Sequence, residues 1–183
     1  MYNVRRIMDN EQLLKLFIEL KNGNMDSFDE FYELTKRGVF SVSFQILRNH
    51  EEAENVLQDT YLQFLKRLPS LKPDKSILAY LMQTSKNLSL NVLKKYKKRD
   101  TAFDMESVPD SSDTGGDDDT VMRVMRETLK PDEIQIVLMH SLYDMTHMEI
   151  AKALRRPLGT ITWSYNNSMK KMKEALKRYG YQE

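Results

Sequence analysis

The sequence contains no cysteine, which excludes disulfide bonds and thiolate-bound metals. It has no run of about 18 apolar residues, the length that a membrane-spanning helix needs. Its first nine residues, Met-Tyr-Asn-Val-Arg-Arg-Ile-Met-Asp, offer no apolar stretch suited to a secretory signal. The alternation of apolar and polar residues that marks a half-buried strand is also scarce. With 40% hydrophobic and 30% charged residues over 183 positions, these absences favour a cytoplasmic, all-α protein.

Groups that could carry out catalysis are scarce as well. The three histidines, His50, His140 and His147, stand in no spacing typical of a metal site or a catalytic triad. The His147-x-Glu149 pair lacks the cysteine pair of a zinc deaminase, and no glycine-rich loop could cradle a phosphate. The sequence therefore predicts a protein that is not an enzyme, with no catalytic residue, metal, cofactor or small-molecule substrate.

Charge is distributed unevenly along the chain, although the net charge is only +1. Residues 1–99 hold 17 Lys and Arg against 12 Asp and Glu, and residues 121–183 hold 11 against 7. Residues 100–120 hold 8 acidic residues and no basic one, in a stretch rich in Gly, Ser and Asp. We predict two small helical domains, at 10–99 and 121–180, joined by a flexible acidic linker at 100–120.

The segment from Thr146 to Met169 has the pattern of a helix-turn-helix. Thr146 and Glu149 form a Thr-x-x-Glu capping box, which marks the start of a helix. The following turn includes Pro157, which cannot continue the first helix but suits the start of the next. The second helix repeats apolar residues at helical spacing, namely Ile161, Tyr165, Met169, Met172 and Leu176.

The opposite face of this second helix, together with the turn before it, carries hydrogen-bonding, aromatic and cationic side chains. Groups of these kinds read base edges and phosphates in a DNA major groove. The candidate DNA-binding residues are Arg155, Arg156, Thr160, Thr162, Trp163, Ser164, Asn166, Asn167, Lys170 and Lys171. The alternative is a plain antiparallel helix pair inside a bundle, because a helix-turn-helix pattern has many false positives.

Amphipathic helices are also expected at 10–22, 26–48, 51–68, 77–99, 120–129 and 131–142. The helix at 51–68 has a polar face, either a solvated surface or a docking face for a partner, formed by Glu54, Asn55, Gln58, Asp59 and Gln63. The helix at 77–99 mixes aromatic, amide and cationic groups on its outward face: Tyr80, Gln83, Lys86, Asn87, Lys94, Lys95 and Lys98. Such a mixture suits a single nucleic-acid strand, although terminal lysines also complement the helix dipole.

Four short motifs occur in a fixed order on the two sides of the acidic strip. They are Glu51-Glu-Ala-Glu-Asn-Val-Leu-Gln-Asp-Thr-Tyr-Leu62, Ala79-Tyr-Leu-Met-Gln-Thr-Ser-Lys-Asn87, Leu129-Lys-Pro-Asp-Glu133, and Met148-Glu-Ile-Ala-Lys-Ala-Leu154 with Gly159-Thr-Ile161. In this order and spacing they resemble a bacterial RNA polymerase sigma factor, in the extracytoplasmic-function group of the sigma-70 family. The resemblance covers about residues 10–178.

The resemblance implies a sigma region 2-like domain, a linker and a sigma region 4-like domain. It assigns the polar face at 51–68 to docking on the clamp helices of the polymerase largest subunit. It assigns the face at 77–99 to the melted −10 strand, and residues 121–178 to the −35 duplex and the polymerase flap on the second-largest subunit. It also implies an anti-sigma protein as a candidate partner, which often sequesters such factors at the membrane.

The sequence departs from the family's pattern at several of these positions. The recognition helix begins Gly159-Thr-Ile-Thr-Trp-Ser164, where the family usually has Gly-Thr-Val-Lys-Ser-Arg, so cations that contact phosphates are missing. Arg155 stands at the expected left-handed helix cap, and Arg156 replaces an apolar core residue. Two alternatives therefore stay open: a helix-turn-helix DNA-binding regulator that never docks on polymerase, and a divergent sigma-like adaptor without promoter recognition.

Overall fold

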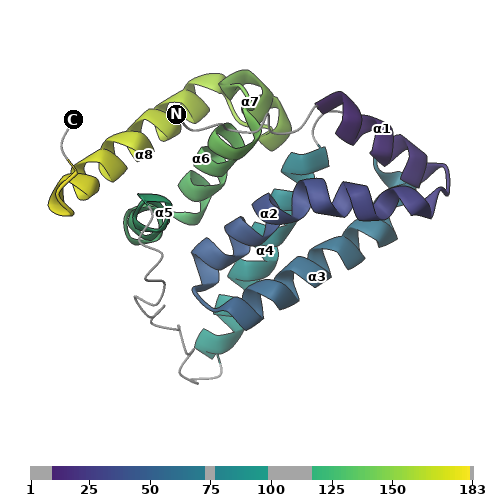
Figure 1. Ribbon diagram of the computed structural model, residues 1–183, viewed down its shortest axis with the longest axis horizontal. Helices are drawn as coiled ribbons and strands as arrows, with labels where there is room; N and C mark the ends of the chain where they lie inside the picture. Colours follow the sequence, from purple (N-terminus) through teal and green to yellow (C-terminus); the bar gives the residue numbers. More distant parts are fainter. Residues whose placement is uncertain (1–9, 73–76, 99–116, 182–183) are drawn as a thin grey trace.

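The computed structural model describes residues 10–72, 77–98 and 117–181, and the regular structure of these residues is helical throughout (Figure 1). The α-helices are α1 (Asn10–Lys21), α2 (Phe28–Leu47), α3 (His50–Arg67), α4 (Ile77–Lys98), α5 (Asp117–Thr128), α6 (Pro131–Tyr143), α7 (His147–Leu154) and α8 (Leu158–Arg178). Two short 3-10 turns, Met25–Ser27 and Leu68–Ser70, precede α2 and follow α3. The all-α prediction is confirmed.

Helices α1 to α4 form one group, called here the N-terminal bundle. Gly23 ends α1 with a left-handed φ of 92°, and the Asn49 side chain caps α3 by accepting from the Glu52 N–H at 2.8 Å. Aromatic rings fill the centre, where Phe31 of α2 stacks on Phe64 of α3 with centroids 4.9 Å apart. These local stops and this shared core hold α3 and α4 in fixed positions side by side.

Helices α5 to α8 form the second group, called here the C-terminal bundle. The expected capping box is present, since the Thr146 side chain accepts from the Glu149 N–H at 3.2 Å and the Glu149 carboxylate accepts from the Thr146 N–H at 2.9 Å. Arg155 takes the left-handed cap of α7 with a φ of 53°. The Arg156 N–H then donates to the Ala151 carbonyl at 2.9 Å and closes the turn. The helix-turn-helix is therefore built as the sequence predicts.

The buried side of α8 differs from the prediction at one position. Ile161 and Met172 are buried, but Met169 is 40% exposed and Ser168 takes the place expected for it in the core. The Ser168 hydroxyl donates to the Ser164 carbonyl at 2.8 Å, which satisfies it inside the helix. The small side chain lets α8 lie close to its neighbours, and the longer methionine turns outward.

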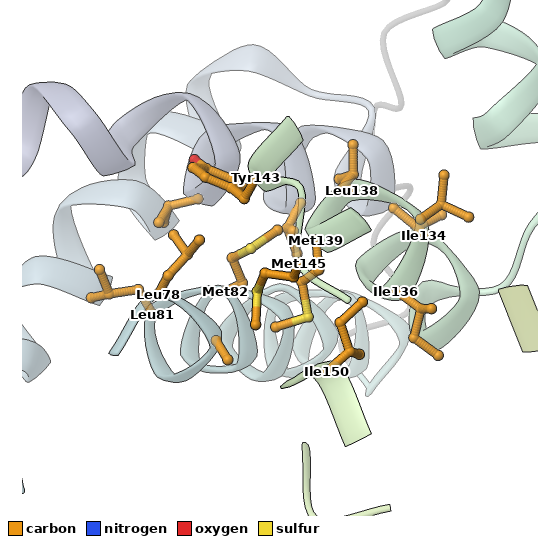
Figure 2. Packing of buried hydrophobic residues seen from close by; sticks show 14 of the residues in the cluster. Leu78, Leu81, Met82, Ile134, Ile136, Leu138, Met139, Tyr143, Met145 and Ile150 are labelled. Atoms are coloured by element: carbon orange, nitrogen blue, oxygen red, sulfur yellow. The ribbon is translucent and has the colours of Figure 1, made fainter. Parts of the chain in front are cut away.

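The two bundles pack against each other and share one hydrophobic core (Figure 1). Helices α2 and α4 contact α6, and α4 also contacts α7. Figure 2 shows Met82 of α4 beside Met139 of α6 and Met145 of the following turn. Tyr143 crosses to α2, where its hydroxyl accepts from the Gly38 N–H at 2.8 Å and donates to the Thr35 carbonyl at 3.2 Å.

Gly38 makes this crossing possible. A Cβ atom at this position would lie 2.6 Å from Cζ of Tyr143 and closer still to its hydroxyl oxygen. Burial raises the pKa of Tyr143 to about 12, even though the hydrogen bond from Gly38 opposes the shift. The glycine inside α2 thus serves the contact between bundles, a role that its helix propensity alone did not indicate.

The segment between α4 and α5 ends earlier than the predicted linker at 100–120. Residues 117–120 belong to α5, because Thr120 is followed by the alternating apolar and basic residues of an amphipathic helix. The rest of the predicted linker, like the end of the 77–99 helix at Arg99, lies outside the described residues.

Candidate nucleic-acid and partner interfaces

Helix α3 presents the predicted docking residues on its outer side. Asn55, Gln58 and Asp59 are exposed, and Glu54 and Gln63 are half-buried. The five residues come together because their spacing follows the helix repeat while Ala53, Val56, Leu57, Thr60 and Phe64 face the core. This polar face is open to a partner.

An apolar feature next to this face was not predicted. Leu62 is 53% exposed and lines a shallow hollow with Phe28, Tyr32, Gln58, Tyr61 and Leu65. The Tyr61 hydroxyl is buried and lies 2.6 Å from the Thr35 hydroxyl, and burial raises the pKa of Tyr61. An exposed leucine within a polar helix face is the signal that could have marked this spot.

On α4, six of the seven candidate residues keep the predicted outward direction to some degree. Tyr80 and Gln83 are half-buried, whereas Asn87 is exposed and accepts from the Gln83 amide at 3.0 Å. The cations Lys94, Lys95 and Lys98 are exposed in the last two turns. An aromatic ring, two amides and a cationic end therefore follow one another along the helix.

The seventh residue, Lys86, does not lie on the outward face. It is only 4% exposed, and its ammonium group lies 2.6 Å from the Asp132 carboxylate of α6. The prediction of an outward Lys86 was wrong because it considered α4 alone, whereas the C-terminal bundle covers this side of the helix. A buried ammonium needs a carboxylate, and Asp132 supplies it.

On α8, an exposed stripe forms at steps of three, three and four residues: Thr160, Trp163, Asn166 and Lys170. Trp163 is 68% exposed, so it is free to make a contact rather than fill the core. Arg155 in the preceding turn is exposed as well, and Ser164 is half-buried. This stripe, on the second helix of the helix-turn-helix, is the one that would face a major groove.

The remaining candidates on this side are held by the protein itself. Lys171 and Asn167 approach the same Glu133 oxygen at 2.7 and 3.5 Å. The Thr162 hydroxyl lies 3.3 Å from Nδ1 of His147, and Arg156 pairs with Asp132 at 2.7 Å. These residues orient α8 on α6 and α7, which leaves the exposed stripe as the accessible part of the predicted set.

Asp132 and Glu133, at the start of α6, therefore organise the candidate DNA-binding side. Partial burial raises the pKa of Asp132, but the hydrogen bonds from Lys86 and Arg156 outweigh it and leave the pKa below its ordinary value. Burial likewise raises the pKa of Glu133. The hydrogen bonds from the Lys130 N–H and the Lys171 ammonium outweigh this effect, so the pKa of Glu133 also lies below its ordinary value. Both residues belong to the Leu129–Glu133 motif.

Across the part of the chain that the structure describes, no three His, Asp or Glu side chains gather where they could hold a metal ion. His140, His147 and Tyr165 instead pack as three rings with centroids 4.6 to 5.2 Å apart, tilted or edge-on to one another. Within the same described ranges, none of the helices combines the length and the hydrophobicity that a membrane crossing requires.

The family model for sigma-70 region 2 matches residues 31–99, which span most of α2 together with α3 and α4. The ECF RNA polymerase sigma factor SigW of Bacillus subtilis is 22% identical, and the match covers 91% of this chain and 98% of that protein. This chain resembles the sigma factors of the extracytoplasmic-function group of the sigma-70 family.

Two solved structures have the same fold as this chain. One is CnrH in complex with the cytosolic domain of CnrY, with a TM-score of 0.65, 14% identity, and 93% of this chain and 99% of that chain covered. The other is RpoE of Bartonella quintana in complex with the anti-sigma factor NepR, with a TM-score of 0.65, 17% identity, and 84% and 98% covered. Sigma factors are initiation factors rather than enzymes, so the prediction of a non-enzyme is confirmed.

Proposed function

We propose that this sigma factor binds core RNA polymerase through α3 and directs transcription from specific promoters. In this proposal α4 holds the −10 strand and the exposed stripe of α8 contacts the −35 duplex. The observation that supports it most is the polar face of α3. Asn55, Gln58 and Asp59 are exposed there, next to the shallow hollow that Leu62 lines. This face lies inside the segment that matches sigma-70 region 2.

The chemistry of each surface suits its proposed partner. Carboxylate and amide groups around an exposed leucine can form a protein interface with an apolar centre and a polar rim. The lysines at the end of α4 offer charge to phosphates, and Tyr80 offers a ring to bases. Lys170 and Arg155 would contact the backbone of the −35 duplex, and Trp163 and Asn166 would lie toward the base edges.

Purified core polymerase provides the test. Asp59→Arg should abolish retention of the chain on immobilised core enzyme, because a cation would stand at the centre of the polar face. Asp29→Arg, an equal change of charge at an exposed position on α2, should leave retention unchanged. Equal retention of the wild type and Asp59→Arg would contradict the docking proposal.

Run-off transcription from the region upstream of the chain's own coding sequence tests promoter selection. Under the proposal, the sigma factor with core enzyme starts transcription at a defined position. A DNA-binding regulator would bind DNA without being retained on core enzyme, and a sigma-like adaptor would be retained without starting transcription. Fractionation of cells tests the site of action, since the proposal places the chain with polymerase in the cytoplasm.

We also infer an anti-sigma partner, because one solved structure with this fold holds the anti-sigma factor NepR. Such a partner would be recovered with the tagged chain from uninduced cells and would block retention on core polymerase. Recovery of the chain only with polymerase under all growth conditions would contradict this inference.

A further inference from the structure

Helix α8 is held against its neighbours by residues that stand directly beside the exposed stripe in the sequence. The Thr162 hydroxyl lies 3.3 Å from Nδ1 of His147 on α7. On the other side, Asn167 and Lys171 reach Oε1 of the buried Glu133 on α6 at 3.5 and 2.7 Å. The three held residues adjoin three members of the stripe: Trp163, Asn166 and Lys170. Because α8 cannot turn about its axis without breaking these contacts, the stripe is fixed as its outward face.

The spacing of the exposed stripe is close to the spacing of base pairs. Thr160, Trp163 and Asn166 follow one another at steps of three residues, or about 4.5 Å along the helix axis. Base pairs in DNA are about 3.4 Å apart. A recognition helix in the major groove contacts base edges with residues of its N-terminal part, and these three residues lie in the N-terminal half of α8. Successive stripe residues therefore reach neighbouring base pairs.

The side chains of the exposed stripe select among the bases. An asparagine amide pairs with adenine, because its N–H donates to N7 and its oxygen accepts from the N6 amino group. An apolar side chain contacts the C5-methyl group of thymine, and the ring of Trp163, which is 68% exposed, offers such a surface. Along the described length of α8, the stripe contains no arginine, the side chain that most often reads guanine.

We propose that the exposed stripe reads adjacent A·T pairs in the −35 duplex, with Asn166 bound to an adenine and Trp163 against the thymine methyl group of a neighbouring pair. This inference rests on the proposed function and adds to it the class of sequence that α8 recognises. Lys170 and Arg155 hold phosphates at the two ends of the stripe, where they supply affinity without selecting a base.

Trp163 is the only tryptophan in the sequence, so its fluorescence reports contact with DNA without a label on the protein. When the full-length chain binds a duplex, the Trp163 emission should shift to shorter wavelength, and quenching by acrylamide should fall severalfold. Fluorescence anisotropy of a dye on the duplex measures binding in the same samples. Binding that leaves both the emission and the quenching of Trp163 unchanged would overturn the proposed contact.

A pool of duplexes with a randomised centre identifies the preferred sequence. The full-length chain is offered this pool with and without core polymerase, and we expect adjacent A·T pairs to be enriched. Asn166→Ala should reduce the preference for adenine at one position by about tenfold. Asn22→Ala, which removes an exposed amide after α1, is the matched control and should keep the wild-type preference. Enriched G·C pairs that depend on Arg155 would assign base reading to the turn and overturn the proposal.

Base analogues test the two contacts atom by atom on the enriched duplex. 7-Deazaadenine carries a C–H group in place of N7, and deoxyuridine lacks the C5-methyl group of thymidine. The first analogue should weaken binding of the wild type severalfold but leave binding of Asn166→Ala unchanged. The second should weaken binding of the wild type but leave binding of Trp163→Ala unchanged. If each analogue weakens the wild type and the corresponding variant equally, the assignment of these contacts is wrong.

The outcomes separate this inference from the proposed function. If the chain starts transcription with core polymerase but enriches no A·T pairs, the readout fails and the proposed function stands. If the chain enriches A·T pairs through Asn166 and Trp163 but is not retained on core polymerase, the readout stands and the sigma function fails. If it binds no duplex of the pool, alone or with core polymerase, both proposals are refuted.

Discussion

The contact between Gly38 and Tyr143 leads to a prediction in which one substitution changes sign with its background. Replacing glycine by alanine inside a helix stabilises it by about 1 kcal/mol in the absence of other contacts. Here the added carbon would lie 2.6 Å from Cζ of Tyr143, and its three nearest atoms all belong to that side chain. Overpacking of this kind costs about 1–3 kcal/mol, and the displaced Gly38–Tyr143 hydrogen bond, 2.8 Å in the wild type, contributes about 1 kcal/mol more.

We therefore expect Gly38→Ala to lower the free energy of unfolding by about 1–3 kcal/mol in the wild-type chain, once the gain in helix propensity is subtracted. In a chain that also carries Tyr143→Ala, the same substitution should raise it by up to about 1 kcal/mol. Urea denaturation of all four chains, followed by circular dichroism, gives the coupling free energy between the two positions, for which we expect about 2–4 kcal/mol. A stabilising effect of Gly38→Ala in both backgrounds would show that α2 and α6 do not meet in solution.

Three further predictions concern the cap, the ion pairs and the DNA-binding stripe. Thr146→Ala removes the acceptor of the Glu149 N–H and should lower the free energy of unfolding by about 1 kcal/mol. The melting temperature should then fall by about 2–4 °C. An unchanged melting temperature would contradict the cap. The pKa of Asp132 is lowered in the folded chain. Its ion pairs therefore stabilise the protein fully at a pH above the ordinary carboxyl pKa of about 4. This stabilisation is lost as the pH falls through the lowered pKa. The difference in melting temperature between the wild type and Asp132→Asn should accordingly be full at about pH 7 and shrink below about pH 4, and a constant difference would contradict the pairing. Lys170→Ala should reduce the slope of the logarithm of the DNA-binding constant against the logarithm of the salt concentration by about 1, as measured by fluorescence anisotropy on a labelled duplex. Lys171→Ala should reduce this slope less, because Glu133 already pairs with that lysine. Equal reductions for the two variants would contradict the assignment of the exposed stripe.

Local features of the sequence predict the helices well, because their causes lie within a few residues. Gly23 ends α1, and Pro131 begins α6. Thr146 caps α7, and Arg155 takes the left-handed turn after it. Each of these effects depends on one backbone conformation or one nearby hydrogen bond, so the residue type alone is informative.

Side-chain exposure along a helix is harder to predict, because it depends on every helix packed against it. The helical repeat places Met169 on the inner side of α8, but the shape of the core selects Ser168. Lys86 follows the polar face of α4 and is nevertheless buried. Nothing near Lys86 in the sequence indicates Asp132, which lies 46 residues away.

The sequence by itself determined the helices, their caps, the exposed polar face of α3 and the family that the chain resembles, since all of these are recorded in residues close to one another. The tertiary structure alone decided which candidate cations are free and which are paired. Asp132 meets Lys86 and Arg156, and Gly38 admits Tyr143, only after α6 has settled on α2 and α4. Contacts between distant segments arise from the packing of whole helices, and the spacing of residues within one helix cannot indicate them.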